Sequence, residues 1–136
     1  MFGFFSKKKK PAIELDPTAG EIARMADDAP PHVQALHMIL EQSLVDRASE
    51  VLLQYDKYRN EFAVYFKRGE SYEEILQPPP SLYAPTQTML AMAGNLNLPE
   101  DEGTFIFPRQ TGGRMRWSIA IEDEGATMAL SMLGYC

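Results

Sequence analysis

The spacing of apolar residues changes near residue 48, and this change constrains the fold more than any other feature. Between Pro31 and Asp46, apolar residues recur at steps of three and four, which predicts a helix with one apolar face. From Glu50 onward, apolar and polar residues alternate in short segments, a pattern typical of strands buried on one side. The chain is therefore expected to pack a helix layer on a sheet.

Six strands and a second helix are predicted after the first helix. Met115, Trp117, Ile119 and Ile121 alternate with polar or small residues, which favours an antiparallel sheet with one covered and one open face. The predicted fold class is α+β, a two-layer sandwich in which two main helices cover one face of a mostly antiparallel sheet of five to six strands. The strands are predicted at Glu50 to Tyr58, Phe62 to Phe66, Tyr72 to Leu76, Thr104 to Phe107, Met115 to Ile121 and Thr127 to Leu133, and the second helix from Ser81, its N-cap, to Gly94.

Length and charge indicate a single acidic domain. With 136 residues, 45% of them hydrophobic, the chain can build one core. We predict a domain over residues 30–136, a linker over 11–29 and a separate tail over 1–10. The net charge of −6 argues against a nucleic-acid partner, because neutralising phosphates requires a surplus of Lys and Arg. The one cysteine, Cys136, allows no intramolecular disulfide, and the predicted location is the cytoplasm.

The first ten residues, M-F-G-F-F-S-K-K-K-K, combine aromatic residues with a basic cluster, and two interpretations stand. In the first, they touch the anionic inner membrane peripherally, where each lysine near the surface contributes about 1 kcal/mol. In the second, they form a solvated tail that keeps the chain soluble. No apolar run approaches the roughly 20 residues that a membrane span needs. The predicted membrane-contacting residues are Phe2, Phe4, Phe5, Lys7, Lys8, Lys9 and Lys10.

The residue types that usually carry catalysis are too scattered to predict an enzyme. His32 and His37 lie five positions apart, so they share a helix face poorly, and Cys136 is the last residue. Runs of acids on predicted turns are typical of solvated surface. No G-x-x-x-x-G-K-[ST] phosphate loop occurs, which argues against ATP hydrolysis. We predict no catalytic, cofactor-binding or metal-binding residue and no cofactor.

A series of local patterns between Pro30 and Leu133 occurs in one order. A helix runs into A-S-E-V, a hairpin ends at Gly69, and S-L-Y-A-P-T-Q-T-M-L-A-M-A-G-N-L-N-L-P-E then precedes E-D-E-G, T-G-G-R and G-A-T-M-A-L-S-M-L. In this order the patterns resemble the second N-terminal domain of type II secretion and type IV pilus assembly ATPases. The resemblance implies a PAS-like sandwich that stands without its motor domain.

The departures from that family bear on function. The family's domain lends basic residues to the nucleotide, whereas the matching positions here are Val64, Phe66, Ser118 and Ser131, and Leu52 or a near neighbour replaces a histidine. The resemblance therefore implies a non-catalytic adaptor in a bacterial secretion or pilus system, with a secretion or pilus ATPase or an inner-membrane platform protein as its partner. The alternative is a PAS-like regulatory domain that senses a small ligand or a nucleotide.

Apolar side chains at former arginine positions predict a surface that contacts a protein partner, because exposed apolar patches mark such surfaces. The predicted partner surface consists of Tyr65, Phe66 and Trp117. The alternative is that these side chains complete an ordinary core, with methionines filling its gaps.

Overall fold

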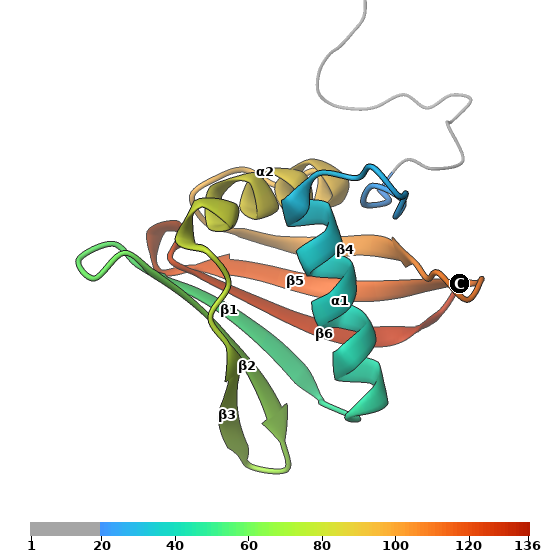
Figure 1. Cartoon of the computed structure of the whole chain (residues 1–136), viewed down its shortest axis with the longest axis horizontal. Helices are drawn as coiled ribbons and strands as arrows, with labels where there is room; N and C mark the ends of the chain where they lie inside the picture. The colour runs from blue at the N-terminus through green and yellow to red at the C-terminus, as the bar shows by residue number, and fades with distance from the viewer. Residues whose placement is uncertain (1–19) are drawn as a thin grey trace, which may run out of the picture.

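The computed structural model describes residues 20–136 as one six-stranded antiparallel sheet with two α-helices (Figure 1). The strand order is β3-β2-β1-β6-β5-β4, so the two strand triplets of the chain meet where β1 pairs with β6. The predicted α+β fold is confirmed. The elements are α1 (Pro31–Val45), β1 (Glu50–Asp56), β2 (Glu61–Arg68), β3 (Ser71–Leu76), η1 (Pro80–Leu82), α2 (Tyr83–Gly94), β4 (Asp101–Pro108), β5 (Arg114–Glu122), η2 (Asp123–Gly125) and β6 (Thr127–Tyr135).

Helix α1 forms where the apolar spacing predicts it, and its apolar face packs on the sheet. Pro31 occupies the first turn, where its missing N–H costs no hydrogen bond. Leu36, Ile39 and Leu40 are each at most 1% exposed. Burying each such side chain contributes roughly 1.5–3 kcal/mol to stability. Figure 1 shows α1 crossing in front of the sheet.

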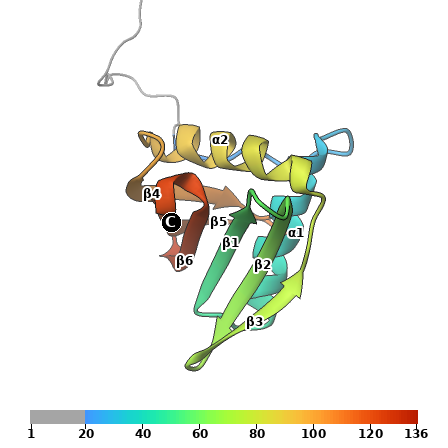
Figure 2. The same cartoon turned by 90° about the vertical axis from the view of Figure 1, so that its left-hand side faces the viewer.

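Helix α2 begins two residues later than predicted. Ser81 makes no capping hydrogen bond; instead it lies within the 3₁₀ turn η1, which leads directly into the helix at Tyr83. The predicted end at Gly94 is confirmed, because Asn95 adopts a left-handed conformation (φ 55°) that stops the helix. Figure 2 shows α2 running along one end of the sheet on the side where α1 lies.

Strand register decides which side chains lie under the helices. Val51 of β1 stands opposite Phe66 of β2 and Leu130 of β6, and all three are at most 1% exposed. Residues two positions along each strand repeat the arrangement, which produces a continuous apolar layer. The largest fully buried side chains of this core are Trp117, Phe62, Phe66, Phe105, Phe107, Leu36, Ile39, Leu40, Leu53, Leu90, Ile119 and Ile121.

Two of the three predicted partner-surface residues belong to this core. Phe66 is 0% exposed and Trp117 is 2% exposed. Both sit at strand positions that face the helices, and the Trp117 ring stacks on Phe105 with centroids 6.4 Å apart. The prediction that Phe66 and Trp117 contact a partner is therefore wrong, and the alternative interpretation as core applies to them.

The described part of the predicted linker is packed on the domain. Glu21 forms a parallel bridge with Ile106 at the outer edge of β4, and Ile22 is 3% exposed. The Glu21 carboxylate also pairs with Arg114 at 3.2 Å. The folded part therefore begins before residue 30. The predicted tail over residues 1–10, with its membrane-contact residues, and the predicted linker up to residue 19 lie outside the described residues.

The two faces of β2 provide a direct test of the register. We expect Phe66→Ala to lower the free energy of unfolding by about 3–5 kcal/mol, because it opens a cavity in the core. Tyr65→Ala on the opposite face should cost about 1 kcal/mol or less, the size of a cross-strand contact. Urea unfolding of both variants measures the difference. Equal losses would contradict the assignment of the two faces.

Candidate functional site

One face of the sheet carries no helix within the described part of the chain (Figures 1 and 2). Strand register places Tyr65, Leu52, Ala129 and Ala120 side by side on this open face, across β2, β1, β6 and β5. We call these four residues the central row. All four are half-buried, although no helix lies over them.

The central row is uncharged, and charged residues lie at its two ends. Glu74 of β3 stands opposite Tyr65, and Glu102 of β4 stands opposite Ala120. Both glutamates are exposed. The positions beside the row on the same face carry both uncharged and charged side chains. These flanking residues are Ala63, Gln54, Thr127 and Glu122 on the side of the β1–β2 hairpin tip, and Lys67, Glu50, Ser131 and Ser118 on the other side.

The open face runs into a notch of about 680 Å³ at one end of the sheet. Strand β1 pairs with β6 only as far as Gln54, and the β1–β2 hairpin continues beyond this point without β6. The notch lies between this hairpin, the turn from β5 to β6 and the first turns of α2. Its volume is in the range of small-ligand sites. The aromatic residues that line it are Tyr55, Tyr58, Tyr65 and Tyr83.

Helix α2 fixes one wall of the notch. The Tyr83 hydroxyl and the Gln87 side-chain amide both donate to the carbonyl oxygen of Gly125 at 2.7 Å. Burial raises the pKa of Tyr83 well above its ordinary value, so the hydroxyl keeps the proton that it donates. Asp123, Glu124 and Gly125 are all left-handed, with φ of 55°, 55° and 92°. These contacts hold an otherwise unfavourable turn in place.

The hairpin wall is shaped by hydrogen bonds within its own tip. One oxygen of Asp56 accepts from the backbone amides of Tyr58 at 2.9 Å and Arg59 at 3.2 Å. The Tyr55 hydroxyl donates to the side-chain oxygen of Asn60 at 2.7 Å. The Tyr55 ring also stacks on Tyr83, with centroids 5.3 Å apart. The stacked rings of Tyr55 and Tyr83 therefore connect the hairpin to α2.

Carboxylates outnumber cations around the notch. The resulting negative potential favours positively charged groups. A cation already lies near one of the tyrosines, because the Lys57 ammonium is 5.3 Å from the Tyr58 ring centroid. The four carboxylates are those of Asp56, Glu61, Asp123 and Glu124, and the two cations are those of Lys57 and Arg59.

The two histidines occupy separate places in the described part of the chain. His37 is 2% exposed, its Nε2 lies 2.8 Å from the carbonyl oxygen of Ala23, and its ring packs near Phe107. Among residues 20–136, no three His, Cys, Asp or Glu side chains gather closely enough to hold a metal ion. His32 lies apart, in a groove beside Val33 and Met89.

The four positions that the predicted resemblance matches to basic residues do not come together in space. Val64 and Phe66 face the helices and are fully buried, whereas Ser118 and Ser131 are paired on the open face. Tyr65 does lie on the open face, so its role in binding a partner stays a prediction. Sequence patterns identified the turn at Asp123 but not the notch, because its walls come from three distant segments.

Comparison with models of known protein families finds no match, and comparison with curated proteins finds no similar sequence. None of the helices within residues 20–136 combines the length and apolar character needed to cross a membrane.

Removing the Tyr83 hydroxyl should loosen the notch. We expect Tyr83→Phe to cost about 1 kcal/mol of unfolding free energy, because the hydrogen bond to Gly125 is lost. Tyr58→Phe is the matched control, since the side chain of Tyr58 is 88% exposed. Chemical denaturation compares the two variants. If neither substitution changes the free energy of unfolding, the Tyr83 hydroxyl does not hold the turn.

Proposed function

We propose that this protein is a non-catalytic interaction module that binds a protein partner through the open face of its sheet. The observation that carries this proposal is the central row, an uncharged band across four strands that no helix of the described chain covers. An antiparallel sheet tolerates one solvated face, but the side chains on such a face are usually polar. Here the middle of the face consists of Leu, Tyr and Ala.

The distribution of residues on the open face matches the anatomy of protein interfaces. Interface centres are depleted in charge and enriched in aromatic residues, and their rims are polar. The central row provides Tyr65 and Leu52 as its large side chains, and Ala120 and Ala129 leave room for side chains of a partner. Glu74 and Glu102 then form part of the rim.

The partner that we propose is a secretion or pilus ATPase or its inner-membrane platform protein. This part of the proposal rests on the resemblance of residues 30–133 to the second N-terminal domain of those ATPases. The six-stranded sheet with helices on one face is compatible with the PAS-like sandwich that the resemblance implies. Contact of Phe2 to Lys10 with the inner membrane is a further part of the same proposal.

The sensor alternative has less support. A PAS-like sensor would hold its ligand between the helix layer and the sheet. That space is filled here by aromatic and branched side chains, among them Phe62, Leu90 and Ile119. A ligand at this place would have to displace them. The adaptor is therefore the function that the geometry supports better.

A charge in the central row should abolish partner binding. We expect full-length protein with Ala129→Arg to lose capture of a secretion-type ATPase or platform protein from native extract, because a guanidinium would be buried in an uncharged interface. The variant should unfold within about 1 kcal/mol of wild type, since position 129 is on the open face.

Val45→Arg is the control, because it adds the same charge on α1, where Val45 is 71% exposed. This variant should capture the partner as wild type does. The proposal fails if Ala129→Arg and wild type capture the same amount of partner. It also fails if wild-type protein binds a metabolite and captures neither class of partner.

A further inference from the structure

We propose that the notch at the end of the open face holds an arginine side chain of the protein partner. The inference rests on the proposed function and deepens it, because the notch and the central row share Tyr65 and are flanked by the same residues, Gln54 and Ala63. A partner lying on the central row would therefore reach the notch with its neighbouring residues.

The charges of the notch select a cation. The Glu124 carboxylate is exposed on the turn, and its own backbone amide is already bonded to Glu100 at 2.8 Å. In Asp123, one oxygen accepts from the Thr127 hydroxyl at 2.9 Å, which leaves the second for another donor. In Asp56, the two backbone amides likewise use one oxygen. Both walls therefore present carboxylate oxygens that can accept hydrogen bonds from an incoming cation.

The tyrosines favour a planar cation over a compact one. A guanidinium stacks on aromatic faces and donates to carboxylates in its own plane, whereas an ammonium is a strongly hydrated point charge. The rings of Tyr55 and Tyr83 are stacked and line the notch together with Tyr65. Several aromatic surfaces therefore accompany the carboxylates.

One of the hairpin's own cations already pairs with a carboxylate of the notch. Arg59 lies 3.9 Å from the Glu61 carboxylate, with the two side chains 72% and 42% exposed. Such an exposed and long ion pair is weak, so an incoming guanidinium can replace it. A volume of about 680 Å³ accommodates an arginine side chain together with part of its backbone.

The fixed turn explains how the notch keeps its shape without a partner. Both hydrogen bonds to the Gly125 carbonyl come from α2, an element of the core rather than of the loop. A pre-formed site loses less conformational freedom when it binds. The walls are therefore in place before an arginine arrives.

The test is a titration of the ¹⁵N-labelled full chain with the peptide acetyl-Gly-Arg-Gly-amide, followed by amide chemical shifts. We expect saturable shifts at Gly125, Ala126 and Asn60, which line or flank the notch. The same peptide with citrulline, which keeps the shape and removes the charge, should shift these amides at least fivefold less. Equal shifts with citrulline would overturn the proposal.

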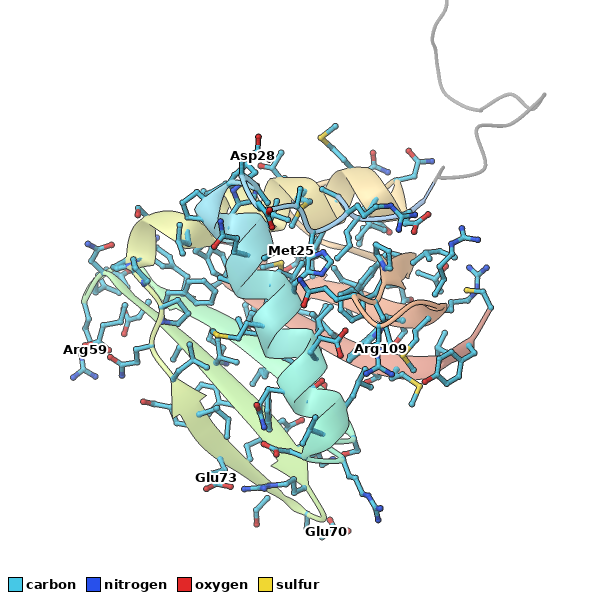
Figure 3. All side chains as sticks on the ribbon, turned by 45° about the vertical axis from the view of Figure 1, so that its right-hand side comes forward. Met25, Asp28, Arg59, Glu70, Glu73 and Arg109 are labelled. Atoms are coloured by element: carbon cyan, nitrogen blue, oxygen red, sulfur yellow. The ribbon has the colours of Figure 1, made fainter. Side chains whose placement is uncertain are left out.

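Two matched variants test whether the carboxylate of Glu124 binds the arginine. Glu124→Gln should weaken arginine-peptide binding at least threefold, and Glu70→Gln should leave it unchanged. Both replace an exposed glutamate at a turn, but Glu70 lies at the other end of the sheet from the Arg59 hairpin (Figure 3). Wild-type affinity in Glu124→Gln, or equal losses in the two variants, would refute the site.

Failure of this inference is distinguishable from failure of the proposed function. If Ala129→Arg abolishes capture of the partner but the arginine peptide shifts no amide in the notch, the open face is an interface and the arginine site is wrong. If the peptide binds in the notch and Ala129→Arg captures the partner normally, the central row is not the interface.

Discussion

The pairing of β1 with β6 is the constraint on which the rest of the structure depends. It joins the strands of the first half of the chain to those of the second, with Val51 opposite Leu130 and Leu53 opposite Met128. All four side chains are at most 1% exposed under the helix layer. A slip of one residue would turn every side chain of one half to the other face. The buried layer and the open face are therefore fixed together.

Local patterns were sufficient to predict the elements because each element carries its own period. The steps of three and four in α1 and the alternation in β5 are readable without knowledge of the tertiary fold. They were not sufficient to distinguish core from partner surface at Phe66. That distinction requires knowing that positions 64 and 66 of β2 face the helices, which only the pairing with β1 decides. The notch was missed for a related reason, since Tyr83 and Gly125 meet only in the folded chain.

Ion pairs attach peripheral segments to the sheet in ways that sequence patterns did not show. Arg109, on the connection between β4 and β5, lies beside α1 (Figure 3) and pairs with Glu41 at 2.8 Å. It also donates to the Tyr135 hydroxyl at 3.0 Å, so one side chain links α1 to β6. Both charged groups are only about one-quarter exposed or less, where solvent screens them incompletely. The Arg109–Glu41 pair lies on the helix side of the sheet, because Glu41 belongs to α1.

This asymmetry bears on what the open face can do. The helix side of the sheet carries the core and the Glu41–Arg109 ion pair. A substitution on that side would therefore change the stability of the domain as well as any binding. On the open face, the central row contributes half-buried side chains that the core does not need. Natural sheets often place charges on their edge strands, where unpaired backbone groups would otherwise pair with another chain. Here Glu74 and Glu102 place charges at the margins, on the edge strands β3 and β4. Charges on the edge strands discourage the addition of another strand there. The uncharged central row leaves the middle of the face able to bind a partner.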